Sequence, residues 1–402
     1  MKILYVYTSA SLTETSVQSK VLNQIKYFNK VGVYCRGAFF STDYKVNGQL
    51  NAYVDQIAVP LNNARYFTQH FQRRKLDKLL YLYIKKHAPY YDCIYFRYPG
   101  ASKGLYKIVK DFKNIVFEIN GNLKLTISKQ FKTVSFKLSN LLHNINFYYI
   151  PKFKENYYGN KILKHVRCLV SVSNELAKIT SLNYKTSSIP FIVVGNGIAV
   201  EDFVTRDYIT NTNSANLTCL MLKGASTEAD YLGFDRFLKG LAHYKGTKKI
   251  KVIAAGKQFK AEEELVKKLG IENLVDFVGY LDKNQIDSLI NDVDVAIGTL
   301  ATYRSNISEI SSLKSREYYA RGIPFIIGYT DTDLSYCDNA KQYIHEVVND
   351  SSDINLDRFI EFCDKILIDK NHPLKMKKIA KNKLDFEAKI IKLFNGLEKY
   401  YV

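Results

Sequence analysis

The sequence lacks a long apolar run. No stretch of about 18 apolar residues occurs, the length that a helix needs to cross a bilayer. The chain also opens on a short strand-like run, Met1–Tyr7, instead of the apolar helical region of a secretory signal. We therefore expect neither a membrane span nor an export signal.

Cysteine and histidine are few and scattered. The six cysteines include no Cys-x-x-Cys spacing, and the seven histidines include no His-x-x-x-His spacing. Several cysteines fall inside strand-like runs, where a thiol behaves as a small hydrophobe. Reduced thiols in the core of a cytosolic protein therefore fit better than disulfides or a metal site. The six are Cys35, Cys93, Cys168, Cys219, Cys337 and Cys363.

Motifs for metals and nicotinamide cofactors are weak or absent. Of two Asp-x-Asp patterns, Asp292–Asp294 opens an apolar strand, which is the wrong end for a ligand. The other, Asp331–Asp333, follows a strand and could hold a cation, although such short acidic turns are common. No Gly-x-Gly-x-x-Gly follows Tyr7, which argues against a nicotinamide cofactor. The sequence predicts no metal and no cofactor.

Acidic residues are scarce in the first half of the chain. Residues 1–200 contain 29 Lys and Arg against 9 Asp and Glu, whereas residues 201–402 contain 29 against 30. A basic, aromatic-rich half beside a neutral half implies an anionic partner for one domain only. An anionic membrane surface carrying a lipid-linked diphosphate explains this asymmetry. Nucleic acid is the rival partner, but no recognisable nucleic-acid-binding module occurs, so we expect none to bind.

Apolar strands alternate with helical segments along the whole chain. A length of 402 residues suggests two domains, and each half repeats the alternation that is typical of a parallel, doubly wound α/β sheet. The hinge is expected near Gly195-Asn196-Gly197, which gives domains over 1–195 and 196–376. The predicted strands are 2–7, 93–98, 115–118 and 168–172 in the first half, then 217–222, 251–255, 275–278 and 293–297.

The most informative segment lies between two apolar strands near residues 293–297 and 324–327. It carries Glu309 and Glu317, eight positions apart, with the small residues Ser311 and Ser312 between them. The order strand, turn, helix, strand places a helix N-terminus at the carboxyl edge of a parallel sheet, where backbone N–H groups and the helix dipole favour phosphate. We expect Glu309 in the turn and Glu317 about five residues into the helix.

This segment resembles the Glu-x7-Glu signature of retaining, nucleotide-sugar-dependent glycosyltransferases of family 4. The variant from Ser312 to Pro324 is similar to family members that build surface polysaccharides. The resemblance implies the GT-B fold, in which two Rossmann-like domains face a cleft. It implies an N-terminal acceptor-binding domain and a C-terminal nucleotide-sugar-binding domain. It also implies that a final helix, about 377–402, packs back on the N-terminal domain.

The resemblance assigns the donor side of the site. Glu317 would hold the ribose hydroxyls and Glu309 would contact the donor sugar, while Ser311, Ser312 and Leu313 would offer backbone N–H groups to the diphosphate. Family members usually carry an Arg and a Lys for the diphosphate, but the expected Lys-Gly has become Leu232-Gly233. The substitute cations are Lys223, beside Gly224, then Lys257 and Lys314.

The resemblance also assigns an acceptor side. The histidine common after the fourth strand is absent, and Glu118 stands there, either as a base or hydroxyl ligand or as a buried strand-end acid that holds a loop. Residues 123–165 interleave lysines with aromatics, which fits a helix at a membrane interface or an ordinary amphipathic helix packed on its sheet. The other acceptor-side candidates are Ser11, Thr13, Asn120, Asn122 and Asn196.

The predicted function is retaining transfer of a sugar from a nucleoside-diphosphate donor to a lipid-linked saccharide. The setting would be the cytoplasmic face of a bacterial plasma membrane, with the enzyme peripherally attached, during capsule, O-antigen or exopolysaccharide synthesis. Two alternatives stay open. One is a sugar-nucleotide 2-epimerase of the same architecture, and the other is a non-catalytic protein that binds membrane or polysaccharide.

Overall fold

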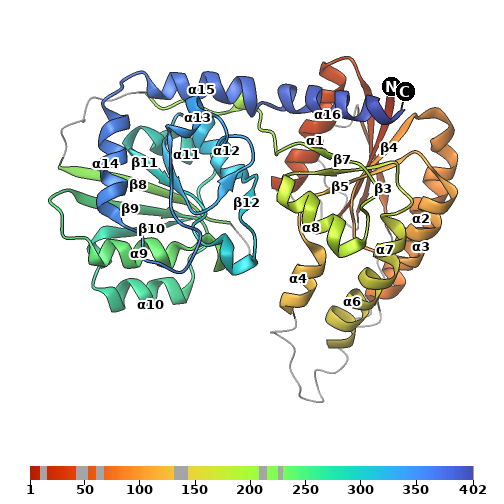
Figure 1. Ribbon diagram of the computed structural model, residues 1–402, viewed down its shortest axis with the longest axis horizontal. Helices are drawn as coiled ribbons and strands as arrows, with labels where there is room; N and C mark the ends of the chain where they lie inside the picture. The colour runs from red at the N-terminus through yellow and green to blue at the C-terminus, as the bar shows by residue number, and fades with distance from the viewer. Residues whose placement is uncertain are drawn as a thin grey trace. The chain divides into compact units, whose positions relative to one another are not determined.

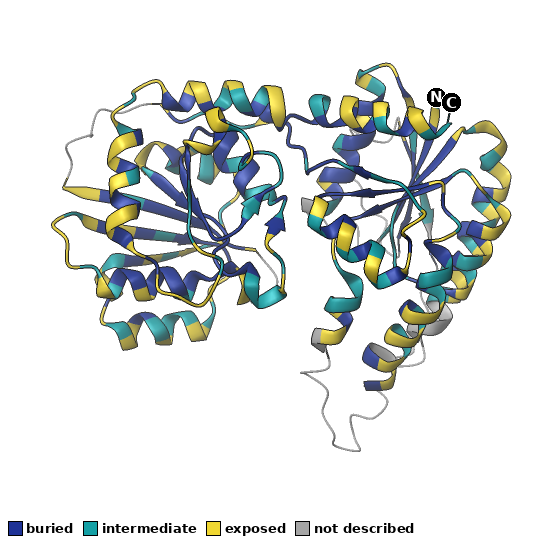
Figure 2. Cartoon of the chain, in the orientation of Figure 1, coloured by how far each residue is buried: buried dark blue, intermediate teal, exposed yellow. Residues whose placement is uncertain are grey.

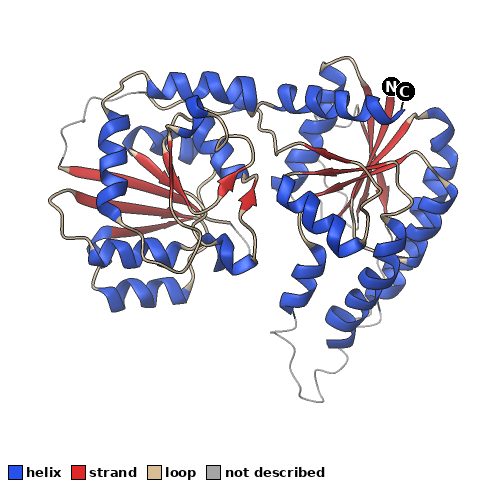
Figure 3. Cartoon of the chain, viewed as in Figure 1, coloured by secondary structure: helices blue, strands red, loops and turns tan. Residues whose placement is uncertain are grey.

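A computed structural model describes residues 1–9, 16–41, 53–59, 68–130, 144–207, 215–224 and 230–401 (Figure 1). These residues form two compact units. Unit 1 comprises Met1–Val194 with Lys389–Val402, and unit 2 comprises Gly195–Ala388. Each unit is a parallel sheet with helices against its faces (Figure 3). The predicted doubly wound α/β class is therefore confirmed.

The sheet of unit 1 has seven parallel strands in the order β3-β2-β1-β4-β5-β6-β7. The order reverses between β1 and β4, and ligands of such sheets bind outside the carboxyl ends of the strands at this switch point. The central strands are buried on both faces (Figure 2), which explains their continuous apolar runs. The strands are β1 Lys2–Ser9, β2 Tyr34–Ser41, β3 Val54–Ala58, β4 Cys93–Arg97, β5 Ile115–Ile119, β6 Cys168–Ser171 and β7 Phe191–Val193.

The helices of unit 1 bury their apolar stripes against this sheet. Leu80 and Ile84 from α2 and Leu105, Ile108 and Val109 from α3 share one core cluster with the strands. The helices are α1 Ser16–Lys30, α2 Thr68–His87, α3 Lys103–Asp111, α4 Leu123–Gln130, α6 Ile150–Lys154, α7 Asn160–Ile162 and α8 Asn174–Tyr184, with π-helical turns at Ile145–Tyr149 and Glu155–Gly159.

The segment 123–165, for which the sequence left two interpretations open, is described in part. The apolar positions expected to form its stripe, Phe131 to Leu142, lie outside the described residues. In the described part, Glu155 is buried and accepts hydrogen bonds from Tyr184 Oη at 2.6 Å, Tyr98 Oη at 2.8 Å and the Ala101 amide at 2.8 Å. One face of the segment is thus anchored to its own sheet, while several aromatic side chains on it stay exposed.

Unit 2 has a six-stranded parallel sheet in the order β10-β9-β8-β11-β13-β15, with the switch point between β8 and β11. A separate pair, β12 Glu309–Ile310 and β14 Thr330–Asp331, is also parallel. The strands of the sheet are β8 Asn216–Leu222, β9 Lys249–Ala255, β10 Val275–Gly279, β11 Val295–Ile297, β13 Phe325–Ile327 and β15 Ile344–Glu346. The helices are α9 Phe234–His243, α10 Lys260–Leu269, α11 Lys283–Leu289, α12 Leu313–Ala320, α13 Asp338–Lys341, α14 Leu356–Leu367 and α15 His372–Lys383.

The C-terminal part differs from the single helix expected over 377–402. The helix α15 ends at Lys383, and a second helix, α16, runs over Phe386–Tyr401. Asp385 lies at the break, where its carboxylate accepts the Glu387 backbone N–H at 3.0 Å and so caps the first turn of α16. The end of α16 packs within unit 1, where Tyr401 Oη donates to the Asn114 carbonyl at 2.9 Å.

The cysteine side chains lie mostly in the core. All six cysteines are free, and all but the half-buried Cys337 are buried. Among the described residues, no helix combines the length and the apolarity needed to cross a membrane.

Candidate functional site

The N-terminus of α12 lies in unit 2, and its position is fixed by one buried tyrosine. The Tyr318 hydroxyl accepts the Leu222 amide at 2.9 Å and donates to the Ile297 carbonyl at 3.2 Å. These two partners end β8 and β11, the strands on either side of the switch point. The helix is therefore bonded to the carboxyl edge of the sheet, where the topology favours a ligand.

The turn before α12 leaves the first N–H groups of the helix uncapped by its own side chain. Ser312 is extended, with φ −76° and ψ 129°, and its hydroxyl makes no cap hydrogen bond. Ser311 is buried, and its hydroxyl accepts the Asn196 amide N–H at 2.6 Å. Backbone donors at the start of a helix favour an anion, so this turn has the predicted geometry of a phosphate site.

Asn196, predicted on the acceptor side, belongs to unit 2. Its side-chain amide donates to the Ser311 carbonyl at 2.5 Å. Its Oδ1 is buried and has no hydrogen-bond partner in the described structure. Asn196 thus positions the turn before α12.

Arg316 uses the acidic turn that follows β13. Its guanidinium is fully buried and pairs with Asp331, and it reaches Asp333 Oδ2 at 2.6 Å. Both carboxylates of this Asp-x-Asp pattern are therefore engaged by a cation of the chain itself. In the described ranges, no cluster of His, Cys, Asp or Glu has the arrangement of a metal site.

Glu317 occupies its predicted place in the local structure, whereas Glu309, expected in a turn, belongs to a short strand. Glu309 lies outside the helix, buried in the short strand β12, and Glu317 is the fifth residue of α12. Glu317 Oε1 accepts Arg321 Nε at 3.0 Å, and Arg321 is held in turn by Asp287 Oδ1 at 2.5 Å. Burial raises the pKa of Glu317, and the charge of Arg321 opposes that shift.

Lys314 is the cation of the first helical turn. Its side chain is half-buried, and burial lowers its pKa to about 8, while the charge of Glu317 opposes the shift and that of Lys223 adds to it. Its ammonium forms no hydrogen bond or ion pair with any described residue. A desolvated ammonium beside helix N–H groups gains a partner when an anion binds there.

The other two predicted cations differ from each other. Lys223 is buried, pairs with Glu262 Oε2 at 2.5 Å and lies 5.0 Å from the Phe277 ring centroid, so it is already committed within the chain. Lys257 is exposed, and its ammonium lies 5.4 Å from the centroid of Phe259. Lys257 and Lys314 are therefore the predicted cations most available to a ligand.

The loops at this edge approach each other closely. Gly256 has φ +122°, and a Cβ there would lie 2.7 Å from the Lys223 carbonyl, so only glycine fits. Gly224 is exposed with open space around it. Leu232, which stands where relatives carry the lysine of Lys-Gly, is buried and supplies no cation.

In unit 1, Glu118 is enclosed by donors at the end of β5. Its carboxylate accepts Lys20 Nζ at 2.5 Å, Tyr95 Oη at 2.9 Å and Tyr5 Oη at 3.1 Å. Burial opposes ionisation, but the charges of Lys20 and Arg97 outweigh it and lower the pKa of Glu118 to about 2. A carboxylate with this pKa is a weak base at neutral pH. The arrangement favours the second of the two predicted roles, an acid that holds a loop.

A small cavity of about 240 Å³ lies beside Glu118. Arg97 Nη1 and Asn120 Nδ2, from two of its lining residues, are buried and have no hydrogen-bond partner in the described part of the chain. Two such donors at one cavity suit an oxygen-rich ligand. Sequence reasoning found Asn120 but missed Arg97, whose signal is a basic residue ending the apolar strand β4.

Of the remaining acceptor-side candidates, Asn122 lies at the start of α4. Asn122 Oδ1 accepts the Leu125 amide at 3.0 Å and so caps α4. Ser11 and Thr13 lie outside the described residues.

Comparison with known proteins identifies the class of fold. Residues 229–383 match the family model of the glycosyl transferases group 1, whereas a search of curated protein sequences finds no significant match. A glycosyltransferase from Rickettsia africae ESF-5 superposes with a TM-score of 0.65 at 16% identity, over 99% of this chain and 98% of that one. The chain therefore has the GT-B fold, as predicted.

Two further structures of this fold are similar over their whole length. WaaG, described as a glycosyltransferase involved in lipopolysaccharide biosynthesis, gives a TM-score of 0.62 at 14% identity, with 98% of this chain and 99% of that chain covered. HepE from Anabaena, solved in complex with UDP-glucose, gives a TM-score of 0.60 at 13% identity, with 98% of this chain and 100% of that chain covered. At such identities the likeness establishes the fold alone, and the family model of the glycosyl transferases group 1 matches residues 229–383.

Proposed function

We propose that this protein is a retaining glycosyltransferase that moves a sugar from a nucleoside-diphosphate sugar to a lipid-linked saccharide. The observation that carries the proposal is the start of α12, at the carboxyl edge of the sheet in unit 2. The N-cap Ser312 makes no capping hydrogen bond there, and the Lys314 ammonium has no partner among the described residues. This part of the chain lies within the match to the glycosyl transferases group 1. The solved complex of HepE with UDP-glucose supports a nucleotide sugar as the donor.

The proposed chemistry needs no nucleophile from the protein. The leaving diphosphate docks on the N–H groups of Leu313 and its neighbours, and Lys314 neutralises part of its developing charge. Electrostatic stabilisation of the leaving group is usually the largest catalytic contribution. The acceptor hydroxyl then attacks the same face of the sugar that the diphosphate leaves, and it transfers its proton to a departing phosphate oxygen. In this scheme Glu317 holds the ribose hydroxyls and Glu309 contacts the sugar.

The acceptor is proposed to bind unit 1. Arg97 Nη1 and Asn120 Nδ2, at the cavity beside Glu118, are buried donors that have no partner in the described structure. The +20 net charge of residues 1–200 supports an acceptor carried by an anionic membrane, at its cytoplasmic face. Capsule, O-antigen or exopolysaccharide synthesis is the corresponding process.

A donor screen tests the proposal first. UDP, GDP and dTDP sugars are titrated into the protein by calorimetry, and at least one should bind. Glu317→Gln should weaken that donor by about tenfold or more, because a charge-assisted hydrogen bond contributes about 1.5–3 kcal/mol. Glu361→Gln, an exposed acid on α14, is the matched control and should bind as the wild type does.

Turnover separates the enzyme from its alternatives. Glu309→Ala should keep donor affinity and lower the rate of sugar transfer. A protein that ignores every nucleotide sugar would be a binding module, and one that converts the donor's sugar without any acceptor would be an epimerase. Wild-type affinity and rate in both glutamate variants would end the assignment.

A further inference from the structure

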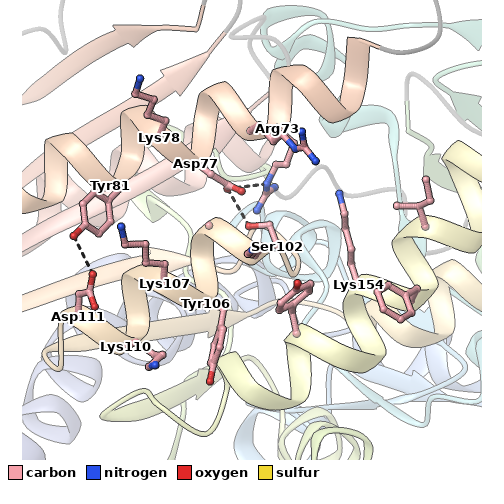
Figure 4. Close-up of a pocket in the computed structure, with 16 residues that line it drawn as sticks. Arg73, Asp77, Lys78, Tyr81, Ser102, Tyr106, Lys107, Lys110, Asp111 and Lys154 are labelled. Carbon is pink, nitrogen blue, oxygen red and sulfur yellow. Dashed lines mark hydrogen bonds and ion pairs between the residues drawn. The ribbon is translucent and has the colours of Figure 1, made fainter.

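A groove of about 1040 Å³ runs along the outside of unit 1, lined by helices (Figure 4). Its walls come from α2, α3 and α6 with the residues beside them, and every lining residue belongs to the described part of the chain. None of them belongs to the proposed donor site or to the cavity at Arg97.

Seven basic side chains line this groove against only two acidic ones. On α2 and on α3 basic residues recur three or four positions apart, so that each helix presents a row of cations to the groove. Like charges at i and i+4 destabilise a helix, and an anion between the rows would reverse that effect. The cations beyond Arg73 are Arg74 and Lys78 from α2, Lys103, Lys107 and Lys110 from α3, and Lys154 from α6.

Both acidic side chains are already engaged within the wall. Asp77 Oδ1 accepts Ser102 Oγ at 3.0 Å and Arg73 Nε at 3.2 Å. Asp111 Oδ2 accepts Tyr81 Oη at 2.9 Å, and Figure 4 shows this pair at the other end of the groove. The other guanidinium nitrogens of Arg73 donate to backbone carbonyls, so Arg73 also belongs to the wall.

Four of the remaining cations have no described carboxylate as a partner. Arg74, Lys78 and Lys103 are exposed, and none of them forms an ion pair with a described carboxylate. Lys107 lies over the Tyr81 ring with its ammonium 4.4 Å from the centroid, and no carboxylate among the described residues pairs with it. The groove therefore presents a positive surface over an aromatic base.

Exposed aromatic rings continue the groove on the segment that contains α6. Phe153 lines the groove and is 63% exposed, and Tyr149 and Tyr157 are each 47% exposed. Phe153 and Tyr157 are stacked, with ring centroids 5.7 Å apart. Aromatic rings next to basic side chains are typical of surfaces at the level of lipid headgroups.

We propose that this groove and its aromatic ridge, Tyr149, Phe153 and Tyr157, dock on an anionic phospholipid surface. Headgroup phosphates would enter between α2 and α3, and the ridge would enter the interface beside them. The charge of the lining and the exposed rings together match such a surface. The inference builds on the proposed function, because a lipid-linked acceptor has to be met at a membrane, but it uses none of the donor-site residues.

Vesicle sedimentation tests the groove with a charge-matched pair of variants. The protein should bind vesicles that contain phosphatidylglycerol, and not phosphatidylcholine alone, with binding that falls as salt rises. Lys78→Glu/Lys107→Glu should lower the partition coefficient by at least about tenfold. Lys26→Glu/Lys178→Glu makes the same charge change on exposed positions of α1 and α8 and should retain binding within about threefold. Equal losses in both pairs would mean that net charge alone drives binding, which overturns the groove.

The ridge has its own control. Phe153→Ala should weaken binding to the anionic vesicles by about threefold or more, because an exposed ring enters the interface. Leu182→Ala removes another exposed apolar side chain, 70% exposed on α8, and should leave binding to the anionic vesicles unchanged. Equal affinity of both variants for the vesicles would remove the ridge from the proposal.

Donor titration keeps this inference separate from the proposed function. All four variants should bind the donor found in the screen as the wild type does, which also shows that they fold. If a donor binds but vesicles are not bound selectively, the docking role of the groove is refuted and the proposed transferase function stands. If vesicles are bound selectively but no donor binds, the transferase function is refuted and the docking role of the groove stands. Preferential binding of a single-stranded oligonucleotide that depends on Lys78 and Lys107 would replace the lipid surface by a soluble polyanion.

Discussion

Donor affinity should fall as pH rises through 8, because one ammonium at the site loses its proton there. Burial lowers the pKa of Lys314 to about 8, and no described residue pairs with it. A bound diphosphate stabilises the charged form and returns the pKa toward its ordinary value of about 10.4. Binding therefore takes up a proton above pH 8. The full affinity is present well below pH 8 and is lost as pH rises above it.

The magnitude follows from this titration. At pH 7 about nine-tenths of the free protein carries the charge, and at pH 9 about one-tenth does. The Kd for the donor should accordingly rise by about tenfold between pH 7 and pH 9, provided that Lys314 stays charged in the complex. Removing the charge altogether, in Lys314→Gln, should weaken the donor by about tenfold to a hundredfold at pH 7.

Calorimetric titration across this pH range measures both effects. Lys314→Arg is the control, since a guanidinium stays charged throughout this range. Between pH 7 and pH 9 the Kd of the wild type should rise by about tenfold more than the Kd of this variant. Comparing the two also cancels any titration of the nucleotide base. Parallel slopes in the wild type and Lys314→Arg would refute the claim that Lys314 contacts the diphosphate.

Two further predictions concern the buried ion pairs. Arg316→Met leaves the Asp331 carboxylate buried without its cation and should lower the free energy of unfolding by about 3–5 kcal/mol in urea, whereas Arg304→Met removes a half-exposed pair and should cost at most about 1 kcal/mol. Similar costs for the two variants would contradict the burial of Arg316. The pKa of Glu118 is lowered to about 2, so its stabilising effect is present above about pH 4.5 and lost toward pH 2. The wild type should therefore lose about 2 kcal/mol more than Glu118→Gln between pH 5 and pH 3, and equal losses would show that this carboxylate is not held as described.

The parts of the fold that follow from local pattern were predictable. Continuous apolar runs such as Ile115–Phe117 identify strands buried on both faces, and the alternation with helices defines parallel sheets. The place of Glu317 in its helix also follows from local order, since the turn before it and the Gly322-Ile323-Pro324 stop fix both ends. Such signals lie within a few residues of the element that they predict.

What the sequence could not reveal depends on partners far apart in the chain. Lys223 pairs with Glu262, 39 positions away, so a cation expected to serve the ligand turns out to be committed. Lys20 and Glu118 are 98 positions apart, and only their contact shows why Glu118 is a poor base. Asp385 caps α16, but the helical pattern continues on both sides of it, so the sequence predicted one helix where the structure has two.

A crystal structure of the protein with its nucleotide-sugar donor tests the proposed donor site most directly. We expect the diphosphate within hydrogen-bonding distance of the backbone N–H groups of Leu313 and Lys314, with the Lys314 ammonium on a phosphate oxygen and Glu317 on the ribose. A donor bound elsewhere, or a start of α12 blocked by side chains of the protein itself, would contradict the proposed site.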